Sequence, residues 1–107
     1  MIPVGSLNLP ERFHRQLLAE VSRRPEVRRV ILFGSRARGD CQARSDIDLA
    51  IEAPSASPRE WSDLEEAITE DAETLLEVDL VRLEKAPPEL CKEILSEGQT
   101  IYERAPQ

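Results

Sequence analysis

The chain has little of what marks a membrane protein, a disulfide-rich secreted domain or a zinc protein. Its 107 residues include two cysteines and one histidine, with no CxxC pair and no Cys/His cluster of zinc-binding spacing. No apolar run approaches the roughly 20 residues that a membrane-spanning helix needs. The first nine residues lack the basic start and long apolar core of a signal peptide. These absences predict a soluble, cytoplasmic protein without membrane contact.

Aromatic residues and excess positive charge are scarce as well. Aromatics make up 4% of the chain, so the core must be built mainly from aliphatic side chains, and the formal net charge is -7. Nucleic-acid-binding proteins usually present a basic patch, because neutralising phosphates supplies much of their affinity. We therefore expect no direct nucleic-acid partner. The length predicts a single domain over residues 1–107, with little room for a separate acceptor-binding domain.

The apolar pattern predicts an α/β fold, in detail α+β: a small mixed β-sheet with helices packed on it. Helices are expected over 8–24, 57–75 and 87–98, and strands over 27–33, 47–52, 77–83 and 100–103. Asn8 with Glu11, and Ser57 with Glu60, have the spacing of capping boxes. The apolar stripe of the helix over 57–75 includes Leu75, and the apolar positions of the last helix include Leu95. We expect His14, beside the stripe of the first helix, to lie at the surface or at its boundary with the core.

The most informative segment reads FGSRARGDCQARSDIDL, from Phe33 to Leu49. In it, Asp46 and Asp48 begin a strand whose intervening residues are apolar. Since successive side chains of a strand point to opposite faces, the two aspartates share one face, roughly 6.5 Å apart along the chain. Asp79 lies inside a later strand-like run. If that strand is a neighbour, its carboxylate can join the first two.

Three unpaired carboxylates in one cleft would repel one another and raise each other's pKa values. Mg²⁺ removes this penalty, since it takes oxygen ligands and commonly combines a few carboxylates with substrate phosphates. Two such ions, about 3.5–4 Å apart, suit the displacement of pyrophosphate by an attacking oxygen. The alternative is structural. Asp46 would then cap a turn, while Asp48 and Asp79 would form ion pairs with one of the arginines Arg36, Arg38 and Arg82.

A Gly-Ser turn, Gly34 and Ser35, precedes the aspartates. A short helical turn beginning here would direct its free N–H groups and its dipole at an anion. Gly34 allows the backbone to approach closely, Ser35 adds a hydroxyl donor, and Arg36 and Arg38 can offset triphosphate charge. The alternative is that both arginines neutralise nearby surface acids. The segment is no P-loop, because GxxxxGK[ST] is absent.

With these residues in place, the chain resembles the minimal nucleotidyltransferases, the MNT branch of the DNA polymerase β-type superfamily. The resemblance rests on Gly34, Ser35, Asp46, Asp48 and Asp79 in that order, and on the closing segment APPELCKEILSEGQTIYE. It covers most of the chain from residue 27 onward and implies a single minimal nucleotidyltransferase domain with a palm-like catalytic core. It also implies that the three aspartates are catalytic and bind magnesium, while Gly34, Ser35, Arg36 and Arg38 bind the nucleotide.

The resemblance further implies an activity and a partner. Members of this branch are commonly encoded beside a helical HEPN-domain protein, often a ribonuclease toxin, and serve as its antitoxin. We expect transfer of AMP from ATP, with release of pyrophosphate, onto a tyrosine hydroxyl of that partner within a hetero-oligomer. Two alternatives stay open. One is a non-catalytic antitoxin that neutralises the HEPN protein by binding, and the other is a transferase acting on a small molecule or an RNA end.

Overall fold

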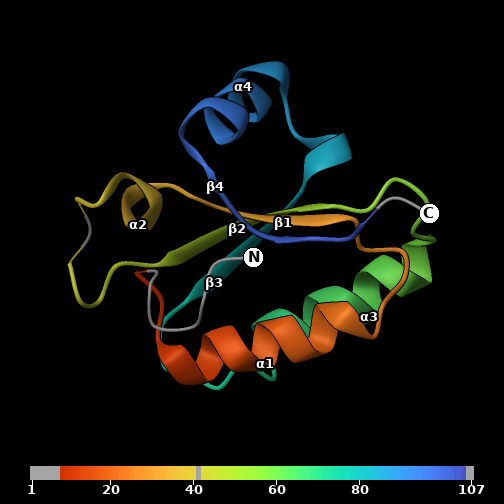
Figure 1. The fold of residues 1–107 in the computed structure, drawn as a ribbon, viewed down its shortest axis with the longest axis horizontal. Coiled ribbons are helices and arrows are strands. Elements are labelled where there is room, and N and C mark those ends of the chain that lie inside the picture. Colours follow the sequence, from red (N-terminus) through yellow and green to blue (C-terminus); the bar gives the residue numbers. More distant parts are fainter. Residues whose placement is uncertain (1–7, 41, 106–107) are drawn as a thin grey trace.

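The computed structural model describes residues 8–40 and 42–105 (Figure 1). Its elements are α1 (Glu11–Ser22), β1 (Arg29–Phe33), α2 (Ser35–Arg38), β2 (Ile47–Glu52), α3 (Pro58–Thr69), β3 (Val78–Arg82), the 3-10 turn η1 (Leu83–Lys85), α4 (Pro88–Glu97) and β4 (Gln99–Glu103). Within these described ranges, no helix has the length and apolar character to cross a membrane. The predicted order of helices and strands is confirmed, with the anticipated short turn appearing as α2.

The four strands form one mixed sheet in the order β3-β2-β1-β4. β1 is antiparallel to both β2 and β4, whereas β2 and β3 are parallel. The parallel pair needs a crossover connection, and α3 supplies it. Figure 1 shows α1 and α3 side by side under one face of the sheet and α4 over the other. The fold is therefore the mixed α/β arrangement that the sequence predicts.

Both faces of the central strand β1 are buried. Val30 and Leu32 belong to the core beneath α1 and α3, and Ile31 and Phe33 belong to a smaller core beneath α4. A strand covered on both faces has a continuous apolar sequence, as residues 30–33 do. Strand β1 is therefore held in place by packing on both of its faces.

Two helix starts follow the local sequence signals. At α3, the Ser57 hydroxyl accepts a hydrogen bond from the Glu60 backbone N–H at 3.1 Å, and the Glu60 carboxylate accepts one from the Ser57 N–H at 2.8 Å. This is the predicted capping box. Helix α4 begins at Pro88 and ends at Gly98, also as predicted.

The start predicted for the first helix is wrong. Pro10 is the N-cap of α1, no side chain caps the helix, and the Pro10 carbonyl accepts the His14 N–H at 2.9 Å. A proline with φ of -57° suits the entry to a helix, so the helix starts at Glu11, after Pro10, and Asn8 is not its N-cap. His14 is also 1% exposed and not at the surface. It lies next to Phe13 on the face that packs into the core.

The predicted extent of α3 is wrong as well. The helix ends at Thr69, and Leu75 is completely exposed instead of buried. The chain leaves the helix early because it must turn back to start β3 beside β2. Leu95 on α4 is likewise 54% exposed, since Ile94 is the residue of that pair that meets the sheet.

Candidate active site

The site begins at the turn between β1 and α2. Gly34 has φ of 75° and ψ of -157°, a conformation that is essentially restricted to glycine. The N–H groups of Ala37 and Arg38 donate to the Gly34 carbonyl at 3.1 Å each, which closes one helical turn. The first N–H groups of such a turn have no acceptor within it. The predicted helical turn after Gly34 is thus present.

Gly34 lies directly against Asp48. A Cβ atom placed on Gly34 would collide with Oδ2 of the Asp48 carboxylate. The sheet explains this contact, because Phe33 at the end of β1 pairs with Asp48 in β2. Only a residue without a side chain allows the Gly-Ser turn and the carboxylate to be so close.

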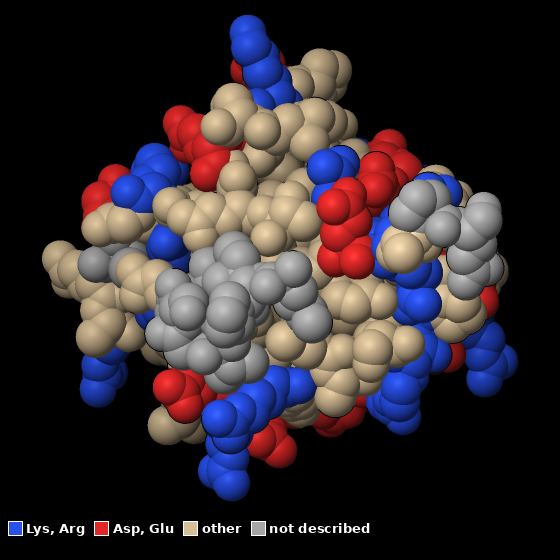
Figure 2. Space-filling model, in the orientation of Figure 1, with Lys and Arg blue, Asp and Glu red and all other residues tan. Residues whose placement is uncertain are grey.

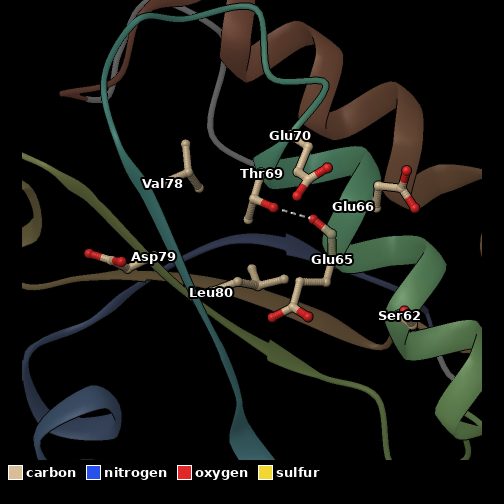
Figure 3. Close-up of a pocket in the computed structure, with 8 residues that line it drawn as sticks. All are labelled: Ser62, Glu65, Glu66, Thr69, Glu70, Val78, Asp79 and Leu80. Carbon is tan, nitrogen blue, oxygen red and sulfur yellow. Dashed lines mark hydrogen bonds between the residues drawn. The ribbon is translucent and has the colours of Figure 1, made fainter.

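Asp48 and Asp79 are neighbours across the parallel strands β2 and β3, at the same register position. The residues flanking Asp79, Val78 and Leu80, belong to or pack against the core under α1 and α3, so Asp79 faces the side of the sheet that carries α4. Figure 3 shows the Asp79 carboxylate pointing away from Val78, Leu80 and helix α3. The predicted adjacency of the third carboxylate is confirmed at the level of strand pairing.

The pKa of Asp48 is raised, first by burial and then by the negative charges of Asp79 and Asp46. Arg38 lowers it and Glu93 raises it further. In the part of the chain that the structure describes, none of the three aspartates forms an ion pair. The structural alternative, in which Asp48 and Asp79 pair with arginines, therefore finds no support here.

The donor set fits a hard divalent cation. A half-buried carboxylate whose pKa is raised by two other carboxylates is a site short of positive charge, and carboxylate oxygens are the ligands that Mg²⁺ prefers. Within residues 8–40 and 42–105, however, no three Asp, Glu, His or Cys side chains converge tightly enough to hold an ion. Asp46, Asp48 and Asp79 as metal ligands remain a prediction.

Arg36 is turned into the protein. It is 6% exposed, and its guanidinium donates to three backbone carbonyls, those of Asn8 at 2.8 Å, Ala43 at 3.1 Å and Ser45 at 3.1 Å. Ser45 immediately precedes Asp46. These contacts give Arg36 a role in holding the loop that carries Asp46, and they occupy the groups with which it would contact phosphate. Its predicted part in nucleotide binding stays a prediction.

Arg38, two residues later, is turned outward. Its guanidinium lies 3.2 Å from the Asp40 carboxylate, 3.5 Å from Glu97 and 3.9 Å from Glu93. The Arg38 side chain is 41% exposed and is therefore accessible to solvent. Glu93 and Glu97 come from α4 and were not anticipated from the sequence. The sequence shows that Glu93 and Glu97 are four residues apart, but only the fold brings them opposite α2.

Two acidic grooves border the aspartates. Asp46 lines one together with Arg44 and Leu75. The other lies between α3 and the free edge of β3, where Figure 3 shows Glu65, Glu66 and Glu70 on the helix opposite the strand of Asp79. Carboxylates would repel a triphosphate, so this second groove is unsuited to hold one.

No continuous basic patch crosses the face drawn in Figure 2, where blue and red side chains are interspersed. The expected absence of a direct nucleic-acid partner stays a prediction.

A β-strand followed by a Gly-Ser turn, with aspartates on two adjacent strands, is the arrangement found in nucleotidyltransferases. Residues 15–107 match the family described as "Polymerase beta, Nucleotidyltransferase". The chain belongs to this family. No curated protein matches it.

Solved structures share the fold. A toxin–antitoxin structure with AMP-PNP matches at 24% identity and a TM-score of 0.67, over 85% of this chain and 73% of that one. A mutant of the toxin–antitoxin MntA–HpeT matches at 27% identity and a TM-score of 0.64, over 90% and 74%. The complex of tri-AMPylated Shewanella oneidensis HEPN toxin with MNT antitoxin matches at 22% identity and a TM-score of 0.61, over 85% and 70%.

Proposed function

We propose that this protein transfers AMP from ATP to a tyrosine hydroxyl of a HEPN-domain toxin and so acts as its antitoxin. The observation that carries the transferase assignment is the contact of Gly34 with Asp48, beside Asp79 in register on the next strand. This geometry brings an anion-facing turn and unpaired carboxylates together at one end of the sheet. Family membership and the similar toxin–antitoxin structures support the assignment.

The turn after Gly34 receives the phosphates. Backbone N–H groups at the start of α2 and the Ser35 hydroxyl donate to phosphate oxygens, and the exposed Arg38 contributes charge from the end of the same turn. Arg36 holds the following loop through its three carbonyl contacts, and with it the position of Asp46. Binding and orientation are the main work left to the protein in such a transfer.

The reaction joins the acceptor oxygen to the α-phosphorus and breaks the bond from that phosphorus to the oxygen shared with the β-phosphate, so that pyrophosphate leaves. Asp46, Asp48 and Asp79 would hold Mg²⁺, which neutralises phosphate charge when bound. Asp79 is exposed on the edge strand, where an acceptor can approach, and in this proposal it accepts the hydroxyl proton. The proton then passes to solvent.

In this proposal the acceptor comes from another molecule. The described part of the chain is a single compact sheet with four helices, and none of these forms a second domain over the site. A helical protein partner would complete the acceptor side. Three AMP groups on the HEPN toxin of one similar structure support that partner class.

The test is to incubate the protein with ATP, Mg²⁺ and the HEPN-domain protein encoded beside it, and to weigh both by intact mass spectrometry. Addition of whole adenylyl units to the HEPN protein, absent with Asp79→Asn, is the expected result. Asp63→Asn is a matched control, because this exposed carboxylate of α3 pairs with Arg59 and does not line the groove that Asp79 borders. Tyrosine as acceptor is checked by fragmenting the modified peptide.

A stable complex without any mass change would contradict catalysis and leave the non-catalytic antitoxin. The net charge of -7 suits binding to a basic partner in either case, so complex formation alone does not separate the two. Mass added to a small molecule or to an RNA end, with none on the HEPN protein, would instead support the other transferase.

A further inference from the structure

Arg38 is shared among three carboxylates at the mouth of the site. Asp40 follows it on the same segment, while Glu93 and Glu97 reach it from α4, one helical turn apart. Figure 1 shows α2 at one end of the sheet and α4 above it, so these pairs bridge two elements distant in sequence. The α2 backbone has its own tie, because the Gln99 side chain donates to the Ala37 carbonyl at 3.0 Å. Arg38 can therefore change partners without moving the helix.

The same arginine is the cation best placed for a triphosphate at the Gly34 turn. It lies close enough to Asp48 to lower the pKa of that carboxyl, whereas Arg36 is committed to backbone carbonyls. Glu93 also acts on Asp48, in the opposite sense. Arg38 thus stands between the carboxylates of α4 and the place where the phosphates would lie.

We propose that Glu93 and Glu97 compete with the phosphates of the nucleotide for Arg38 and thereby set the affinity of the site for nucleoside triphosphates. The proposal rests on the nucleotidyl transfer proposed above. In the free protein Arg38 pairs with Asp40 and with Glu93 and Glu97 of α4, and the nucleotide must exchange the α4 contacts for its own. This competition also contributes to specificity for nucleoside triphosphates, because a ligand with fewer phosphates displaces the carboxylates less well.

Weak pairing makes such an exchange feasible. Ion pairs between exposed side chains are weak and are screened by salt, and all three side chains are more than 40% exposed. Removing the two carboxylates deletes both their competition for Arg38 and their direct repulsion of phosphate. The two effects are separable, because only the first requires Arg38.

The experiment measures binding of AMP-PNP with Mg²⁺ by isothermal titration calorimetry, so that no turnover is needed. The variants are Glu93→Gln/Glu97→Gln, Arg38→Met, and the three changes combined. Glu89→Gln is the control, because it removes one charge from the exposed start of the same helix, where no ion pair is present in the described structure. Titrations at two salt concentrations show the electrostatic part.

We expect the double variant to bind on the order of fivefold more tightly than the unmodified protein, corresponding to about 1 kcal/mol. Glu89→Gln should change the affinity much less. In the Arg38→Met background, the gain from the two glutamine substitutions should shrink to the size of that control. ADP and AMP should show smaller gains than AMP-PNP.

Equal or weaker binding by the double variant would overturn the proposal, since the carboxylates would then be neutral or would hold Arg38 ready for the nucleotide. An undiminished gain in the Arg38→Met background would also overturn it, because simple repulsion would explain the effect. If the unmodified protein bound no AMP-PNP at all, the proposed nucleotidyl transfer itself would fail.

Discussion

Gly34 and Asp48 are in contact across the β1–β2 pair, at a distance that leaves no room for a side chain on residue 34. The contact links the two parts of the proposed site, the turn after Gly34 and the carboxylates. It also means that the glycine is required twice, for its backbone conformation and for the space that it leaves.

Gly34→Ala should therefore abolish transfer. The conformation of Gly34 costs about 1–3 kcal/mol for a residue with a side chain, and the new methyl group would displace the Asp48 carboxylate. Gly39→Ala is a matched control. Gly39 has φ of 85° in the left-handed region, and a methyl group there would meet nothing within 4 Å, so the change costs about 1–2 kcal/mol without touching the site.

The measurements are urea unfolding and adenylyl transfer on both glycine variants. Both should be less stable, and only Gly34→Ala should lose activity under conditions where it is still folded. Normal transfer by folded Gly34→Ala would show that the contact with Asp48 is dispensable.

Arg36→Met should destabilise the protein by about 2–4 kcal/mol, because three backbone carbonyls lose a charged donor in a buried place. Methionine keeps the apolar stem of the side chain. Arg59→Met, at a side chain 91% exposed on α3, should stay within about 0.5 kcal/mol. Equilibrium urea denaturation of both variants measures the difference, and equal effects would mean that Arg36 does not brace the loop.

Asp48→Asn should raise the melting temperature at neutral pH while lowering transfer by about a hundredfold or more. Folding raises the pKa of Asp48, so its negative charge opposes folding at every pH above that raised value. The amide carries no such charge. As the pH falls through the raised pKa, the carboxyl is protonated in the folded protein and the advantage of asparagine should disappear.

Mg²⁺ should reduce the difference in melting temperature between Asp48→Asn and the unmodified protein, because it should stabilise the unmodified protein. A ligand that binds only the folded state stabilises it by mass action, so the melting temperature of the unmodified protein should rise with Mg²⁺ concentration. Asp48→Asn should respond much less. Differential scanning fluorimetry with Mg²⁺ and with EDTA provides the comparison, and an identical response of the two proteins would argue against Asp48 as a ligand.

His14 should make the protein less stable in mild acid. Burial lowers the pKa of its imidazole, and its Nε2 has no hydrogen-bond partner in the described structure. Below the ordinary pKa of 6.5, the unfolded chain takes up a proton that the folded protein resists, so the free energy of unfolding falls with pH.

His14→Leu should remove this part of the pH dependence. Between pH 7.5 and 5.5 the unmodified protein should lose more stability than the variant, by at most about 1.4 kcal/mol per pH unit. Carboxyl groups such as Asp48 act in both proteins and cancel in the comparison. Parallel urea titrations at the two pH values measure it, and parallel curves would exclude a role for His14.

Local signals predicted the parts of the fold that depend on neighbours in sequence. The capping box of Ser57 with Glu60 formed, and the run of residues 30–33 became the strand buried on both faces, because each signal acts within a few residues. Predictions failed where the tertiary path overrode periodicity. Leu75 continues the helical spacing of α3, yet the chain must leave that helix to reach β3.

By itself, the sequence determined the catalytic candidates and their order, because Gly34, Ser35, Asp46 and Asp48 act through a turn and a strand whose geometry is local. The tertiary structure decided which strand brings Asp79 beside Asp48. It also decided that Arg36 contacts backbone carbonyls while Arg38 contacts carboxylates. Arg36 and Arg38 are two residues apart on one helical turn, so they point in different directions. The loop carbonyls around one and the α4 carboxylates around the other come from distant segments, and only packing brings them there.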